Sequence, residues 1–180
     1  MKAISRDEVQ QILRRDGAAG GRGDSRITTA VQSSDFQWFT VSLSDEESFF
    51  SLTWHDVPRS RILSTESLGL RDVARRLLHH GWTFDSLADQ TNLSTLRRFG
   101  DYEPSYFAEC AAIDRSFDFD LFTPPILVLP NADEQHRNPI GIFYLMDGTH
   151  RTLVLAKKLL LNELPYQPIQ ALLLSPRPRH

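Results

Sequence analysis

The sequence predicts an α/β (α+β) fold, a mixed sheet with flanking helices in a single compact domain. The chain has 180 residues, a length that suits one domain. Its composition, 41% hydrophobic and 24% charged, is typical of a globular protein. In the last third, short apolar runs at 125–129 and 140–146 have the pattern of strands covered on both faces. A helix over 149–161 and a strand over 167–174 complete an order that favours a compact sheet.

The middle of the chain is predicted to contain two strands and three helices. Aromatic and β-branched residues dominate 36–43 and 49–54, and the polar interval between them predicts a hairpin. Apolar residues then recur at helical spacing up to Gly81, a residue type that commonly follows the end of a helix. The three helices are expected over residues 68–80, 83–90 and 104–115.

The beginning of the chain differs from the rest. A short helix is expected over 6–15, with Ser5 as its cap. The glycine-rich run 17–25 indicates a linker, because it lacks the Gly-Lys-Ser/Thr ending and the preceding strand of a phosphate-binding loop. The chain therefore divides into an N-terminal extension, a main domain and a basic tail, at residues 1–34, 35–175 and 176–180.

Charge and cysteine content exclude several classes of protein. With 20 basic and 23 acidic residues the formal charge is −3, so any binding of nucleic acid must depend on a local patch. A single cysteine, Cys110, forms neither an internal disulfide nor a thiolate zinc site by itself. No run approaches the roughly 20 apolar residues that span a bilayer. We expect a cytoplasmic protein without a disulfide partner or an integral membrane segment.

The junction between a buried strand and a helix at 144–151 is the candidate site. The first amides of a helix have no partner within it, and the helix dipole adds positive charge there, so such a place binds phosphate. Gly148 and Thr149 contribute backbone amides, and Gly148 allows close approach of a ligand. His150 and Arg151 add donors, and Asp147 is placed to hold Mg²⁺ or orient a nucleophile. Asp147, His150 and Arg151 are the predicted catalytic residues, and residues 148–151 are the predicted nucleotide-binding ones. In the alternative interpretation this is an ordinary turn capped by Asp147 or Thr149.

The residues Asp147-Gly148-Thr149-His150-Arg151, Ala156 in the helix, and the strand 169–173 resemble the nucleotide-binding core of the ParB/sulfiredoxin superfamily. Upstream, Pro124-Pro125-Ile126-Leu127-Val128 is similar to the "Pro-Ile-x-Val" strand of that superfamily. The resemblance covers residues 121–174, less than a third of the chain. Thr149 stands where sulfiredoxins have a catalytic cysteine, so reductase chemistry is not expected.

The resemblance implies binding of ATP with Mg²⁺ or another divalent cation at the start of the helix. It further implies ATPase and metal-dependent DNase activity in a plasmid-encoded fertility-inhibition factor that blocks type IV secretion of DNA (T-DNA or a competing plasmid). The implied partners are the transferred DNA and the secretion coupling protein or a relaxase–DNA complex. Binding to the secretion apparatus would also place this cytoplasmic protein peripherally at the inner membrane.

Further candidates lie outside the junction. Asp118 and Asp120 would share one side of an extended segment and are a candidate metal pair, although such acids are more often a solvated loop. Two arginine pairs are candidates for contact with a DNA backbone, or else belong to exposed helix faces. They are Arg75, Arg76, Arg97 and Arg98, with Arg59 and Arg61 in support. Other candidates for the second half of the site are Asp101, Glu103, Glu109, Asp114 and Arg115.

Two alternative functions stay open. In the first, the protein is a non-catalytic inhibitor that docks on the secretion coupling ATPase or the DNA-transfer complex through aromatic residues of 36–54. In the second, it is a phosphotransferase similar to the free-serine kinases of the superfamily, which carry Asp-Gly-His-His-Arg at the same place.

Overall fold

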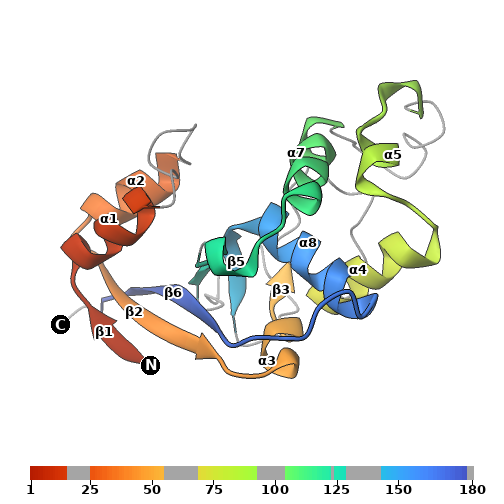
Figure 1. Cartoon of the computed structure of the whole chain (residues 1–180). Coiled ribbons are helices and arrows are strands. Elements are labelled where there is room, and N and C mark those ends of the chain that lie inside the picture. Colours follow the sequence, from red (N-terminus) through yellow and green to blue (C-terminus); the bar gives the residue numbers. More distant parts are fainter. Residues whose placement is uncertain (16–24, 55–68, 93–103, 123, 129–142, 178–180) are drawn as a thin grey trace.

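A computed structural model describes residues 1–15, 25–54, 69–92, 104–122, 124–128 and 143–177 (Figure 1). Within these ranges the N-terminal half contains β1 (Lys2–Ile4), α1 (Arg6–Arg15), α2 (Ser25–Gln32), β2 (Phe36–Leu43), α3 (Glu46–Phe50), β3 (Thr53–Trp54) and α4 (Leu70–His79). The elements that follow are α5 (Phe84–Ala88), η2 (Gln90–Asn92), α7 (Pro104–Arg115), η4 (Phe119–Leu121), β4 (Ile126–Val128), β5 (Tyr144–Asp147), α8 (Thr149–Leu160) and β6 (Ile169–Pro176).

The strands form one mixed sheet, which confirms the predicted fold class. Across the described residues the strand order is β1-β2-β6-β4-β5-β3. The pairs β1/β2, β2/β6 and β4/β5 are antiparallel, whereas β4/β6 and β3/β5 are parallel. Between the parallel strands β4 and β6 the chain runs through β5 and then α8. Helix α8 therefore lies in the crossover that joins two neighbouring strands at the centre of the sheet.

Helices cover both faces of the sheet, because alternate side chains of each strand point to opposite faces. Trp38 of β2 and Leu172 of β6 belong to a smaller core with residues of α1 and α2. Their neighbours Phe39 and Leu173 contact a larger core that includes α4, α5, α7 and α8. Figure 1 shows α1 and α2 apart from the group of α4, α5, α7 and α8.

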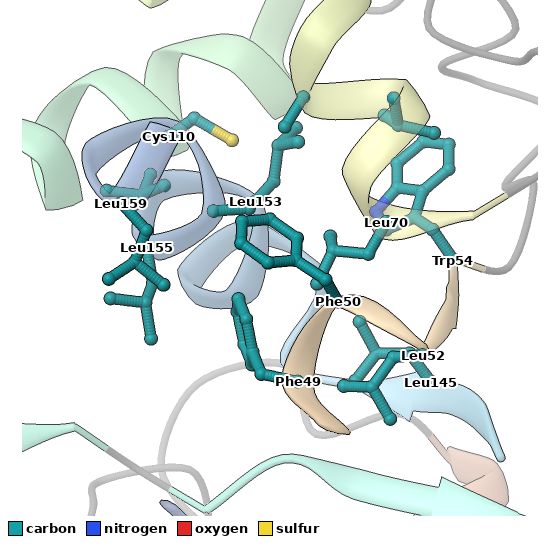
Figure 2. Packing of buried hydrophobic residues seen from close by; sticks show 14 of the residues in the cluster. Phe49, Phe50, Leu52, Trp54, Leu70, Cys110, Leu145, Leu153, Leu155 and Leu159 are labelled. Atoms are coloured by element: carbon teal, nitrogen blue, oxygen red, sulfur yellow. The ribbon is translucent and has the colours of Figure 1, made fainter. Parts of the chain in front are cut away.

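The larger core is mostly aromatic and aliphatic, and α8 lies at its centre. Leu153 and Leu155 of α8 are fully buried, and Phe49, Trp54 and Leu70 pack in the same cluster (Figure 2). Burial of side chains of this size contributes about 2 kcal/mol each. The helix that begins at the candidate site is therefore rigidly held along its length.

Most predicted elements are confirmed, and several have identifiable local causes. The predicted helix over 6–15 is α1, where the Ser5 hydroxyl accepts a hydrogen bond from the Glu8 amide (3.2 Å) and Glu8 Oε2 accepts one from the Ser5 amide (2.7 Å). The strand over 36–43 is β2, and the helix over 104–115 is α7, with the same bounds. Helix α4 ends before Gly81, which has φ +65°.

The predicted hairpin over 36–54 is wrong. The polar interval is the start of helix α3, because the Asp45 carboxylate accepts a hydrogen bond from the Ser48 amide (2.7 Å) and caps the helix. Phe49 and Phe50 lie in this helix and are buried. The short strand β3 that follows pairs with β5 and not with β2. Aromatic residues were interpreted as strand formers here, whereas a helix cap decides the local structure.

The N-terminal extension is part of the sheet. Strand β1 pairs with β2, and Val9 of α1 is fully buried in the smaller core. The linker predicted at 17–25 lies almost wholly outside the described residues; only Ser25 is described, and it begins α2. Among the described residues, no helix has the length and apolar character needed to cross a membrane.

Candidate functional site

The junction between β5 and α8 is a tight turn through one residue. Strand β5 ends at Asp147, which pairs with Ile126 of β4, and α8 begins at Thr149. Gly148 joins them with φ +85°, a left-handed conformation that favours glycine. A Cβ on Gly148 would lie 3.4 Å from Cα of Pro125. The left-handed turn thus favours a glycine here, and the chain entering β4 passes close beside it.

The first turn of α8 has no side-chain cap. Gly148 is the N-cap residue, and as a glycine it offers no side chain to cap the helix. The carbonyl of Gly148 instead accepts hydrogen bonds from the amide (2.9 Å) and the hydroxyl (2.6 Å) of Thr152. The N-cap residue is thus Gly148, and neither Asp147 nor Thr149 holds that position. Helix amides that lack a side-chain cap are suited to an anion.

Arg151 turns back from α8 toward the end of β5. Its Nη2 lies 3.8 Å from Oδ2 of Asp147 and 3.0 Å from the position that a Cβ on Gly148 would take. The side chain of Arg151 is 27% exposed and that of Asp147 is 37% exposed. A guanidinium so placed, beside a carboxylate and the first helical turn, suits bidentate contact with phosphate oxygens.

His150 faces another element, helix α7. Its Nε2 lies 3.5 Å from Oε2 of Glu109, and its ring lies over the ring of Tyr106 with centroids 4.0 Å apart. The two predicted basic residues thus flank different sides of the first turn, because consecutive helical residues point about 100° apart. The structure brings Asp147, Gly148 and Arg151 together, and it places His150 with α7.

Burial fixes the protonation of two groups on α7 near His150. It raises the pKa of the Tyr106 hydroxyl well above its ordinary value, so this hydroxyl stays protonated. Burial also raises the pKa of the Cys110 thiol, which is fully buried. A buried neutral thiol is a poor nucleophile.

The candidate metal pair has a different local structure from the one predicted. Phe119–Leu121 is a 3-10 helix, and Asp118 is its N-cap, with Oδ1 accepting a hydrogen bond from the Asp120 amide (2.9 Å). The extended segment that would align Asp118 and Asp120 is thus absent, because the Asp118 side chain stabilises a turn. In the ranges described, no group of three or more His, Cys, Asp or Glu side chains is arranged to hold a metal ion.

The predicted arginine pairs are described only in part. Arg75 is exposed on α4, whereas Arg76 beside it is half-buried, so the two do not share one exposed face. Four other candidates lie outside the described residues: Arg59, Arg61, Arg97 and Arg98.

Of the remaining candidates for the second half of the site that the structure describes, only Glu109 is seen in contact with a residue of the junction. Glu109 contacts His150, whereas Asp114 pairs with Lys157 and Lys158 at the other end of α8. Arg115 pairs with Asp85 of α5 at 2.6 Å. Asp101 and Glu103 lie outside the described residues.

Tyr106 was not predicted from the sequence. The available signal was its spacing of three residues from Glu109, which places both side chains on one face of a helix. That spacing indicates that Tyr106 and Glu109 share a face of α7, but it does not indicate that this face contacts the start of α8.

Comparison of the chain with protein-family models, with curated proteins and with solved structures finds no match.

The aromatic residues suggested as a docking surface are mainly core. Trp38, Phe49, Phe50 and Trp54 are at most 4% exposed, and Phe36 and Phe39 are half-buried. The four buried rings cannot contact a partner, which leaves Phe36 and Phe39 as the partly exposed aromatic residues of β2; the docking alternative stays a prediction.

Proposed function

We propose that the protein is a nucleotide-binding phosphohydrolase that holds ATP at the start of α8. The observation that carries the proposal is the first turn of α8, which has no side-chain cap and has Arg151 and Asp147 beside it. The backbone amides of a first helical turn, the positive end of the helix dipole and a guanidinium all favour a polyphosphate. The resemblance of residues 147–151 to the ParB/sulfiredoxin superfamily supports the same ligand.

The residues supply two contributions to phosphoryl transfer. The first is positioning, since backbone amides and Arg151 hold the phosphates from one side of the turn. The second is neutralisation of the charge that develops in the transition state. In hydrolysis a water oxygen bonds to the terminal phosphorus while the bond to the bridging oxygen breaks. His150 donates a proton to the leaving oxygen and regains one from solvent, and the attacking water loses its proton to solvent.

A divalent cation fits this site through Asp147. Mg²⁺ binds through one or two carboxylates together with substrate phosphates and water, so a cluster of protein carboxylates is not required. The Asp147 carboxylate is partly exposed and lies beside the proposed phosphate position. When bound, the ion would neutralise phosphate charge.

The finer function follows from the resemblance alone. We propose that the same chemistry includes metal-dependent cleavage of DNA, and that the protein acts like the plasmid-encoded fertility-inhibition protein Osa. Its partners would then be the transferred DNA and the coupling protein or relaxase complex of a type IV secretion system.

The decisive test is hydrolysis of ATP with Mg²⁺ by the Arg151→Ala variant. We expect the rate to fall by at least about 100-fold, the usual effect of removing one transition-state donor. The melting temperature should change by no more than about 3 °C, because a partly exposed ion pair contributes little stability.

Arg115→Ala is the matched control, since it removes an exposed arginine–aspartate pair from α7 and should leave hydrolysis unchanged. A folded Arg151→Ala variant that hydrolyses ATP at the normal rate would contradict the assignment. Incubation with plasmid DNA and Mg²⁺, with and without EDTA, tests the nuclease separately: nicking that the chelator abolishes supports it, and intact DNA contradicts it.

A further inference from the structure

Helix α7 contributes two side chains that together hold the imidazole of His150. Tyr106 supplies a ring whose plane lies 31° from that of His150, with centroids 4.0 Å apart. Glu109, one turn later on α7, places Oε2 3.5 Å from Nε2 of His150. Tyr106 is 6% exposed and is fixed in the larger core, so it offers a rigid base for the imidazole.

The contact between Glu109 and His150 has a chemical consequence for the imidazole. A carboxylate beside one ring nitrogen favours the proton on that nitrogen and so selects one tautomer of the neutral ring. With Nε2 protonated toward Glu109, exchange of a proton with a substrate must use Nδ1.

We propose that Glu109 is a positioning residue for His150, and that it directs Nδ1 to the leaving oxygen of the nucleotide. This inference rests on the proposed function. His150 enters the step as the imidazolium and gives the Nδ1 proton to the oxygen as the phosphorus–oxygen bond breaks. The neutral ring then keeps its proton on Nε2, facing Glu109, and Nδ1 takes a proton from solvent before the next turnover.

Stability does not account for this contact. The Glu109 side chain is 66% exposed, and ion pairs of that exposure contribute little to folding. The structural attachment of α7 to α8 is made elsewhere, by Asp114 with Lys157 and Lys158 at 2.6 and 2.8 Å. An exposed glutamate beside a partly buried histidine at the proposed site is better suited to orienting that histidine.

Glu109→Ala tests the proposal with two independent readouts in the full-length protein. In hydrolysis of ATP with Mg²⁺, we expect kcat to fall about tenfold with KM changed by less than twofold, a part of the usual contribution of general acid catalysis. In ¹⁵N spectra of the imidazoles, we expect the His150 signal, identified by its loss in His150→Gln, to lose its preference for the Nε2-protonated tautomer. Glu109→Gln, which keeps an acceptor, should retain more of that preference than Glu109→Ala.

Glu47→Gln is the matched control, because Glu47 also forms an exposed ion pair, with Arg71 at 2.7 Å on α4. It should change neither readout. An unchanged tautomer in a folded Glu109→Ala variant overturns the role of Glu109 whether or not the protein hydrolyses ATP. If Arg151→Ala abolishes hydrolysis while Glu109→Ala leaves kcat intact, the proposed function stands and this inference fails. If the wild type does not hydrolyse ATP, the proposed function fails, and with it the step assigned to Nδ1, even where the tautomer responds to Glu109.

Discussion

The two ends of α8 carry charges of very different character, although both ends face α7. At the C-terminal end, Lys157 and Lys158 lie 2.6 and 2.8 Å from the carboxylate of Asp114, and their side chains are only 13% and 14% exposed. At the N-terminal end, the contacts of His150 and Arg151 with carboxylates are 3.5 and 3.8 Å long. The side chains there are 27% to 66% exposed.

The C-terminal group is built into the core. Lys157 lies 4.9 Å above the ring of Phe84, and Lys158 lies 5.8 Å above that of Phe117. Burial by itself would raise the pKa of Asp114, but hydrogen bonds from Lys157 and Lys158 hold it below its ordinary value. These groups satisfy one another, which leaves little capacity for a ligand.

The difference distinguishes charges that hold the packing of α8 from charges that are proposed to bind a ligand. Close, buried and mutually satisfied charges fix the packing of α7 on α8. The longer and more exposed contacts at the N-terminal end cost little to break, as the proposed binding of a phosphate there requires. Substitutions at either end of α8 test this difference.

The largest expected effect is at the C-terminal end. Asp114→Ala leaves two partly buried lysines without this carboxylate, and we expect it to lower the free energy of unfolding by about 3 kcal/mol. Denaturation in urea measures this change. Asp85→Ala removes an exposed carboxylate that also bonds to α7 and should cost less than about 1 kcal/mol. Equal losses for the two variants would remove the distinction between buried and exposed pairs.

A smaller effect is expected from Gly148→Ala at the N-terminal end. The left-handed backbone and the contacts of the new Cβ with Arg151 (3.0 Å) and Pro125 (3.4 Å) should cost about 2 kcal/mol. Gly81→Ala has a similar φ of +65° but no atom within 4 Å, so it isolates the backbone strain at about 1 kcal/mol. Urea denaturation of both variants gives the difference, which is the contribution of close packing at the site. Equal costs would show that Arg151 and Pro125 adjust freely.

The smallest effect is the dependence of stability on acid. Because the pKa of Asp114 is lower in the folded state, its contribution is complete above its unfolded pKa, near 3.8, and is lost as the pH falls through the lower folded value. Asp114→Asn should therefore lose less stability than the wild type between about pH 5 and pH 2. Thermal unfolding across that range measures the slope, and parallel curves for the two proteins would contradict the assignment.

Helix α1 and strand β2 were predictable because local signals agree with their tertiary setting. Ser5 and Glu8 form a capping pair around the start of α1, and the alternation of β2 matches its two covered faces. The segment after β2 was not predictable from the same signals. Phe49 and Phe50 favour a strand by composition, but the cap at Asp45 starts a helix that buries both rings.

The site divides in the same way. Its backbone, a strand that ends in Asp147 and Gly148 and a helix that begins at Thr149, was predictable, because apolar runs and a glycine mark both boundaries. The direction of its side chains was not. That Arg151 turns back over Gly148 while His150 turns toward Tyr106 depends on where α7 and Pro125 lie.

Local patterns in the sequence were enough for the mixed α/β fold class and for a strand–glycine–helix turn at 147–151, since periodicity and glycine act over a few positions. Only the tertiary structure decided which face of the sheet each helix covers, and which residues of α7 meet α8. Those contacts join residues more than forty positions apart, and their geometry depends on how the larger core packs rather than on any local pattern.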